Sequence, residues 1–144
     1  SYRGLENPFG HVWSWTDGCK CDIQSAAAGG ISEFFVCTDP AKFQMNTYEG
    51  YEKRGELPRG SGYVKIMMIG EYGENMPTEI GGSSTTYFSD YFYTDITNNT
   101  GQRGVLFGGA AYYGALAGFA GANASYAASL ARADVGSRLC FFPA

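Results

Sequence analysis

The stretch FGGAAYYGALAGFAGANASYAASLARADVGSR, residues 107–138, decides how the rest of this chain is interpreted. Alanine and glycine alternate there with Tyr, Leu, Asn, Ser, Arg and Asp. The order follows neither the 3.6-residue period of a helix nor the two-residue period of a strand. About half of the segment is restricted to tiny residues while the other half varies widely. Such a mixture calls for an explanation other than regular secondary structure.

The composition indicates one folded domain. With 144 residues, the chain is long enough to bury roughly two thirds of its unfolded surface in a single core. It is 44% hydrophobic and only 17% charged, with 2 Trp, 11 Tyr and 10 Phe, which is too apolar for a disordered chain. The net charge of −4 and the isoelectric point near 4.9 provide no basic surface for nucleic acid and disfavour anionic membranes.

The four cysteines are Cys19, Cys21, Cys37 and Cys140. They form no C-x-x-C pair and lack the repeated spacing of a zinc site. A bridge between Cys19 and Cys21 would be strained, and a link from one of them to Cys37 or Cys140 remains open. We favour free, mostly buried thiols. Because the chain starts at Ser1 without a leader, we expect it to be part of a longer protein or a processed product.

Strand-like patterns dominate the rest of the chain, and amphipathic helices of ordinary length are absent. Residues 39–61 are expected to form a long irregular surface segment, and 98–101 a turn. These features predict an α+β or mainly β domain with short strands, long loops and little helix. The expected strands are 12–15, 31–38, 62–70, 85–96, 103–109 and 137–142.

Two stretches carry a family resemblance. GLENPFGHVWSWTDG (4–18) resembles the G-N-V-W-E-W element of the formylglycine-generating-enzyme-like branch of the C-type lectin fold. Gly108-Gly109 and VGSRL (135–139) resemble that branch's paired GGS and GFR landmarks. Within the branch, the chain most resembles the variable proteins of diversity-generating retroelements, which include phage tail-fibre tips and surface adhesins. The resemblance covers the two ends, about a third of the chain.

The resemblance implies a single α+β domain over 1–144, with a C-type lectin fold and a variable region at about 103–140. The two ends would pair as neighbouring strands, and the segment between the landmarks would cross a sheet face. Supporting residues, all but one of them small, would hold its backbone close, namely Gly108, Gly109, Gly114, Gly118, Phe119, Ala122, Ala124, Ala127 and Ala128. The ligand-binding positions facing outward would be Ala110, Tyr112, Tyr113, Leu116, Asn123, Ser125, Tyr126, Leu130, Arg132 and Asp134.

The residue types in this segment agree with that resemblance. Such retroelements mutate template adenines, usually in AAC or AAT codons, which cannot yield Lys, Glu, Gln, Met or Trp. Residues 104–136 contain none of these five. Tyr112, Tyr113 and Tyr126, with Arg132 and Asp134, have the composition of an antibody-like binding surface. The alternative is that these tyrosines are ordinary core residues.

Other interpretations of the same residues are weaker. The uncharged run 105–131 is long enough to span a membrane, but its glycines and polar residues dilute it, and we expect no membrane insertion. Trp13 and Trp15 are expected in the core. We expect Arg138 to pair with a carboxylate such as Glu6 or Asp17.

Catalysis has little support in the sequence. His11 is the single histidine, no G-x-S-x-G or phosphate-binding loop occurs, and Cys140 lies on a segment expected to be a buried strand. We therefore predict that the protein is not an enzyme and needs no cofactor. Residues 93–99 offer oxygen ligands, so a structural calcium ion remains open, but the Glu-Pro-Asn and Trp-Asn-Asp motifs of sugar-binding lectins are absent.

These observations predict an extracellular receptor-binding domain, on a virion tail fibre or a cell surface. The expected ligand is a cell-surface protein or a glycan, bound at equilibrium by the diversified face. A homotrimeric parent would add avidity. Two alternatives stay open: an enzyme like the formylglycine-generating enzyme, which requires a reactive cysteine, and a structural fibre module without a specific ligand.

Overall fold

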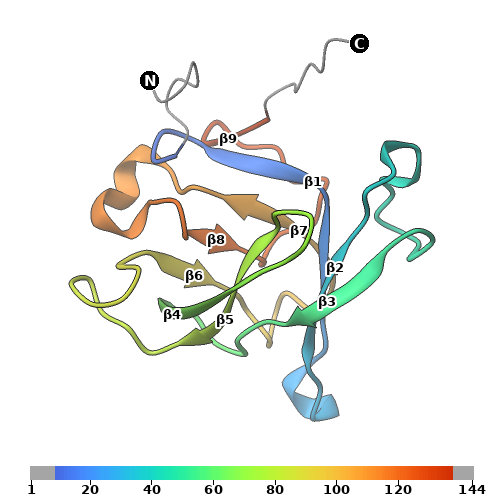
Figure 1. The fold of residues 1–144 in the computed structure, drawn as a ribbon, viewed down its shortest axis with the longest axis horizontal. Coiled ribbons are helices and arrows are strands. Elements are labelled where there is room, and N and C mark those ends of the chain that lie inside the picture. Colours follow the sequence, from blue (N-terminus) through green and yellow to red (C-terminus); the bar gives the residue numbers. More distant parts are fainter. Residues whose placement is uncertain (1–8, 138–144) are drawn as a thin grey trace.

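Strand β1, Trp13–Ile23, organises the fold, because three other strands pair with it. The computed structural model describes residues 9–137, and its strands form one nine-stranded sheet (Figure 1). Along the sheet the order is β3-β2-β1-β7-β8-β6-β4-β5, with β9 on the remaining part of β1. The other strands are β2 Ser32–Val36, β3 Glu52–Glu56, β4 Gly62–Ile69, β5 Asn75–Ile80, β6 Tyr91–Tyr93, β7 Gly101–Phe107, β8 Ala122–Asn123 and β9 Val135–Gly136.

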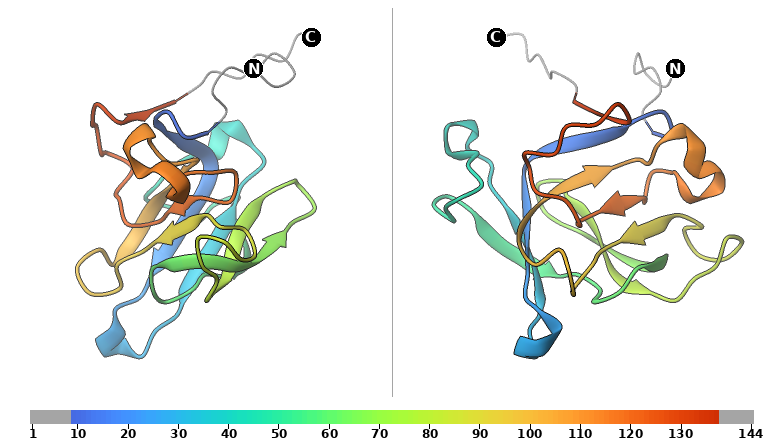
Figure 2. Two further views of the ribbon diagram at one scale, coloured as in Figure 1. Left: turned by 90° about the vertical axis from the view of Figure 1, so that its left-hand side faces the viewer. Right: turned by 180° about the vertical axis from the view of Figure 1, so that it is seen from behind.

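The prediction of an α+β domain with a C-type lectin fold is wrong. Helical structure within residues 9–137 is limited to three 3-10 segments, η1 Ala26–Ala28, η2 Pro40–Lys42 and η3 Ala111–Leu116. The sheet curls into a nearly closed barrel, which is an all-β arrangement (Figure 2). Even the longest of the 3-10 segments, η3, is interrupted by glycine, since Gly114 has a non-helical φ of 54°.

The barrel interior holds the main hydrophobic core. Alternate residues of the strands point inward, so that Cys21, Ile23, Phe34, Phe92 and Val105 lie in one buried cluster. Their exposed fractions are between 0% and 3%. Because the side-chain period of a strand is two, the neighbouring residues of the same strands face the outside of the barrel.

The sequence located some strands better than others. The expected strands at 31–38, 62–70 and 103–109 are confirmed as β2, β4 and β7. The turn expected at 98–101 begins earlier, at 96–98 with a bend at 99, and β7 starts at Gly101. Segment 39–61 is not wholly irregular, because it contains η2 and β3. Only 91–93 of the expected strand 85–96 is a strand, since positive φ angles at Tyr87 and Ser89 turn the chain before it. The candidate at 137–142 lies almost entirely outside the described residues.

The two edges of the sheet are joined by side chains. Arg54 on β3 donates from Nε to Oε1 of Glu74, which precedes β5, over 2.8 Å. It also contacts Glu71 on the β4–β5 turn over 3.2 Å. A Cβ on Gly55 would lie 3.0 Å from Sδ of Met68 on β4, so the two edges approach closely. These contacts between the two edges nearly close the sheet into a barrel.

Much of the C-terminal segment, residues 107–137, packs on the outer face of the sheet, while β8 within it is a strand of the sheet itself. Trp13, Leu106 and Ala110 form a second buried cluster. Tyr113 and Tyr126 of this segment pack against it. Four further partly buried residues also pack against it, namely Trp15, Tyr93, Leu130 and Val135. At the end of the segment, β9 pairs in parallel with β1, Val135 opposite Trp13. The resemblance implied that the two ends pair as neighbouring strands. Residues 13–14 and 135–136 do pair in this way, while the expected strand 137–142 lies almost entirely outside the described residues. No helix in the described part of the chain is long and apolar enough to cross a membrane.

Candidate ligand-binding face

Strand β6 places two tyrosines on the outside of the barrel. Phe92 is completely buried in the interior core, so Tyr91 and Tyr93 on either side of it face the opposite way. Tyr63 on β4 lies directly opposite Tyr91 in the antiparallel register. The three side chains therefore share one face of the sheet, next to the C-terminal segment.

Tyrosine rings form a continuous row on this face. Ring centroids are 5.1 Å apart for Tyr63 and Tyr91, 4.7 Å for Tyr91 and Tyr93, and 5.4 Å for Tyr93 and Tyr113. Tyr112 continues the row at 4.5 Å from Tyr113. Most of these contacts are edge-on or tilted, the arrangement that aromatic rings prefer over face-to-face stacking. We call Tyr63, Tyr91, Tyr93, Tyr113 and Tyr112 the tyrosine row.

The buried indole of Trp13 supports the row. Its centroid is 6.0 Å from that of Tyr93 and 5.5 Å from that of Tyr113, both nearly perpendicular. Trp13 is 2% exposed, which confirms its expected core position, while Trp15 is partly buried beside it. The middle of the row is thus fixed by packing, while Tyr112 at its end is 63% exposed.

A polar network follows Tyr112. Its hydroxyl donates to Oδ2 of Asp134 over 2.5 Å. Arg132 holds both oxygens of the same carboxylate, from Nε over 2.9 Å and from Nη2 over 3.2 Å, and donates from Nη1 to the Tyr126 hydroxyl over 3.4 Å. Such a bidentate contact fixes the plane of the Arg132 guanidinium. Residues from three places in the C-terminal segment are therefore held in one arrangement.

The network shifts the ionisation of its members. The hydrogen bond to Asp134 raises the pKa of Tyr112, and the same bond, helped by Arg132, lowers the pKa of Asp134. Burial raises the pKa of Tyr93 to about 12, with neighbouring tyrosines adding to the effect. The raised pKa values of Tyr93 and Tyr112 favour the neutral phenol at these two positions, and the lowered pKa of Asp134 favours its ion pair with Arg132.

The structure divides the ten predicted outward positions. Tyr112 and Arg132 are exposed, and six are partly exposed: Tyr113, Leu116, Ser125, Tyr126, Leu130 and Asp134. The outward prediction is wrong for Ala110 and Asn123, which are 1% and 3% exposed. Ala110 packs on Trp13, and Asn123 lies in β8 between β6 and β7, where its Oδ1 accepts from the Ser125 N–H.

The predicted supporting residues divide similarly. Five of them are buried: Gly108, Gly109, Gly118, Ala122 and Ala124. A Cβ on Gly109 would lie 2.5 Å from Cβ of Ala117, and one on Gly118 would collide with the Asp90 carboxylate. The supporting role is wrong for Gly114, Ala127 and Ala128, which are exposed, and for Phe119, which is 63% exposed.

Three residues of the face were missed by the sequence analysis. Tyr63, Tyr91 and Tyr93 lie outside the expected variable region, on β4 and β6. The alternation YFY at 91–93 was the available signal, since it puts both tyrosines on one face of a strand. Their closeness to Tyr113 depends on the pairing of β6 with β8, which the sequence does not show.

Other predicted sites are less organised. No group of three or more His, Cys, Asp or Glu side chains within 9–137 could hold a metal ion. In the 93–99 segment, Asp95 instead accepts hydrogen bonds from the N–H groups of Thr97 and Asn98. His11 is exposed, and its neighbours form no such group. Cys140, Arg138 and Glu6 lie outside the described residues.

The other three thiols are free, as expected. Cys21 and Cys37 are buried and Cys19 partly so. Burial, with smaller contributions from Glu74 and Asp17, raises the pKa of Cys19 to about 12, and burial also raises that of Cys21. Such thiols are poor nucleophiles at neutral pH.

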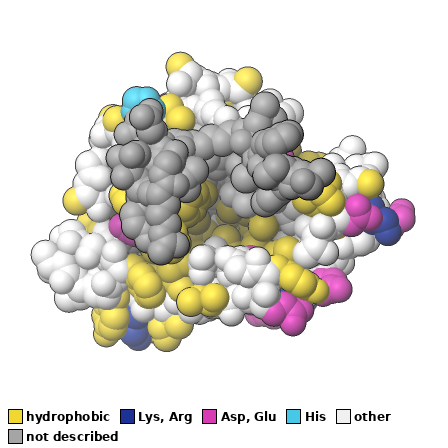
Figure 3. Space-filling model, turned by 45° about the horizontal axis from the view of Figure 1, so that its top comes forward, with side chains coloured by type: hydrophobic (Ala, Val, Ile, Leu, Met, Phe, Trp, Pro, Cys, Tyr) yellow, Lys and Arg dark blue, Asp and Glu magenta, His cyan; other side chains and the backbone are white. Residues whose placement is uncertain are grey.

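The charged side chains that can be seen in Figure 3 lie mainly at the right-hand and lower margins of the view. Comparisons of the chain with models of protein families, with curated proteins and with solved structures found no match.

Proposed function

We propose that this domain is a binding module, and that its ligand contacts the tyrosine row together with Tyr126, Arg132 and Asp134. The observation that carries the proposal is the continuous path from Tyr63 through the row to Tyr112, Asp134 and Arg132. Tyrosine and arginine are the residues that contribute most at binding surfaces, because they combine large contact area with polar groups.

The geometry also supports low reorganisation on binding. Trp13 and Leu106 hold the centre of the face, and the Arg132–Asp134 pair fixes its end, so few side chains remain to be ordered by a ligand. Affinity rises when such ordering costs are avoided. The ligand we propose is a cell-surface protein or a glycan, and the setting is extracellular, as part of a tail fibre or a surface adhesin.

We extend the proposal to the origin of the face. Diversification by a retroelement would alter the positions from 103 to 140, which supply Tyr112, Tyr113, Tyr126, Arg132 and Asp134, while Tyr63, Tyr91 and Tyr93 would stay constant. Sequencing the DNA that flanks the gene tests this part. A near-copy of the codons for 103–140 that differs at template adenines is expected, and its absence, together with that of a reverse transcriptase gene, contradicts the extension.

The binding proposal itself is tested on arrays of glycans and of cell-surface ectodomains. The protein is expected to bind a member of one array, and the double variant Tyr112→Ser, Arg132→Ser is expected to weaken that binding at least about tenfold. Tyr72→Ser is the matched control, because Tyr72 is a 53% exposed tyrosine on the β4–β5 turn. Equal loss in the control, or full binding by the double variant, contradicts the proposal.

A further inference from the structure

A three-residue bulge interrupts strand β1. Thr16 lies opposite Val105 on β7, and the next pair is Lys20 opposite Gly104, so Asp17, Gly18 and Cys19 have no partner on β7. Gly18 has φ +73°, which suits glycine. Bulges redirect side chains and occur often beside binding sites. Here the bulge turns the Asp17 side chain to the surface, where it is exposed.

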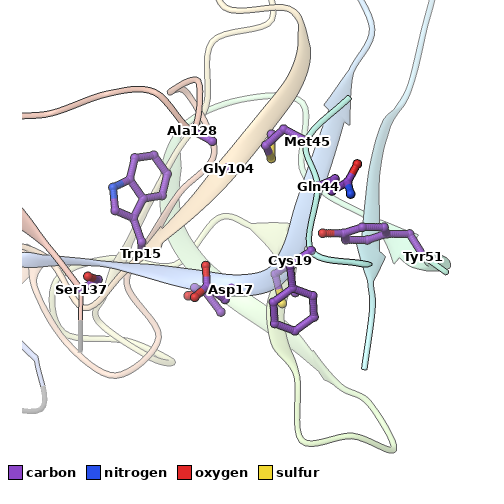
Figure 4. A pocket seen from close by; sticks show the side chains of 12 residues that line it. Trp15, Asp17, Cys19, Gln44, Met45, Tyr51, Gly104, Ala128 and Ser137 are labelled. Atoms are coloured by element: carbon purple, nitrogen blue, oxygen red, sulfur yellow. The ribbon is translucent and has the colours of Figure 1, made fainter. Parts of the chain in front are cut away.

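A cavity of about 270 Å³ lies beside this bulge. Trp15 forms one side of it, Tyr51 and Gln44 form the other, and Asp17 lies between them (Figure 4). Phe43 also lines it. This cavity is separate from the tyrosine row, because none of its lining residues belongs to that row.

Two glycines give the cavity its aromatic walls. A Cβ on Gly104 would lie 2.5 Å from the Trp15 ring, and a Cβ on Gly18 would lie 2.9 Å from the Phe43 ring. Without side chains at these positions, both rings can lie directly against the backbone of neighbouring strands. The walls therefore depend on specific residues in two strands and one loop.

The charges around the cavity differ in their availability. Lys20 is completely buried, and its Nζ donates to the carbonyl oxygens of Gln44 and Thr47 and lies 3.9 Å from the Tyr51 ring centroid. Tyr51 is thus already engaged by a cation. The Asp17 carboxylate, in contrast, has no hydrogen bond or ion pair with any residue from 9 to 137. Within residues 9–137, the Asp17 carboxylate and the rings of Trp15 and Phe43 are therefore the groups of the cavity wall that no charged side chain engages.

We propose that this cavity binds an organic cation the size of a quaternary ammonium head group. Aromatic faces attract such a cation through their quadrupole, and a carboxylate at the same cavity supplies the opposite charge. The volume is below the 300–1,000 Å³ of pockets for drug-sized ligands, so a head group or a methylated lysine side chain fits better than a large molecule. The net charge of −4 also favours a cationic ligand.

The test compares choline with 3,3-dimethylbutan-1-ol, an uncharged molecule of the same shape. Each is titrated into the protein while the two indole N–H signals are followed by NMR. Choline is expected to shift the Trp15 signal and leave that of Trp13 in place, with the alcohol binding about tenfold more weakly. Equal affinity for the two molecules, or no shift with choline, overturns the proposal.

Variants identify the groups involved. Asp17→Asn is expected to weaken choline binding several-fold, whereas Glu49→Gln, which removes the same charge from an exposed position outside the cavity, leaves it unchanged. Phe43→Ala is expected to weaken binding as well, with the melting temperature checking that the fold persists. Equal effects of Asp17→Asn and Glu49→Gln overturn the assignment. Binding of the array ligand at the tyrosine row is independent of all three variants.

Discussion

The Arg54 guanidinium donates a 2.8 Å hydrogen bond to Glu74, and this pair links the two edge strands of the sheet, β3 and β5. Burial alone would raise the pKa of Glu74, but hydrogen bonds from backbone N–H groups and from Arg54 outweigh it and leave the pKa below 4.5. At pH values between the folded and the unfolded pKa, the folded protein keeps this carboxylate ionised while the unfolded chain binds a proton there.

The pair therefore makes a pH-dependent contribution to stability. That contribution is complete above the unfolded pKa of about 4.5 and is lost as the pH falls through the lower folded pKa. We expect the difference in urea midpoint between the wild type and Glu74→Gln to be largest near pH 7 and to shrink between pH 5 and the folded pKa. A difference that stays constant across this range would show that the carboxylate charge is unimportant.

Lys20 fixes the loop that covers the outer face of β1. Replacing it with methionine keeps most of the buried methylenes but leaves the carbonyls of Gln44 and Thr47 without this donor. We expect Lys20→Met to cost about 1–3 kcal/mol of unfolding free energy and to speed proteolysis within residues 39–51. Lys42→Met is the control, since Lys42 forms only a partly exposed ion pair with Glu49. Equal proteolysis of both variants would contradict the role of Lys20.

The hydrogen bond between Tyr112 and Asp134 is expected to control the ionisation of the phenol. Asp134→Asn removes the negative acceptor that raises the pKa of Tyr112. One tyrosine should then ionise at a lower pH in an NMR titration of labelled tyrosine rings, and Tyr112→Phe identifies its signal. The exposed Glu79 on β5 provides the comparison, since Glu79→Gln should leave the Tyr112 titration where it is.

Gly18 is expected to tolerate substitution less well than Gly29. Both have positive φ angles, +73° and +61°, so alanine strains the backbone at either position by about 1–2 kcal/mol. At Gly18 the added Cβ would also lie 2.6 Å from the Cys37 carbonyl oxygen, whereas at Gly29 it meets nothing within 4 Å. Thermal melting should show a larger loss for Gly18→Ala, and matching losses would refute the crowding at the bulge.

The buried thiols are expected to be unreactive in the native protein. In a Cys140→Ser background, Cys19 and Cys21 should label slowly with a thiol reagent at pH 8, because burial raises the pKa of both. Denaturant should expose all of them. Rapid native labelling of Cys19 would contradict the protection of this thiol by burial.

Local patterns in the sequence predicted much of the sheet. Apolar runs separated by Gly, Pro and Asp located β2, β4 and β7, and the tryptophans marked the start of β1. The edge strands β3 and β5 were not predicted, because at least half of the residues in each are polar or charged, as in EKRGE. Neither strand shows alternating buried residues. The bulge at Gly18 was not predicted either, because the pair Asp17-Gly18 is equally typical of a turn.

The sequence by itself determined the residue types of the C-terminal segment: small residues that permit close packing, and tyrosines, arginine and aspartate suited to contact. Only the tertiary structure decided which of them reach the surface. Ala110 and Asn123 are buried because the pairing of β8 with β6 and β7 and the packing on Trp13 enclose them. The same non-local pairing brings Tyr63, Tyr91 and Tyr93 beside Tyr113, since strands distant in the chain meet only through sheet register.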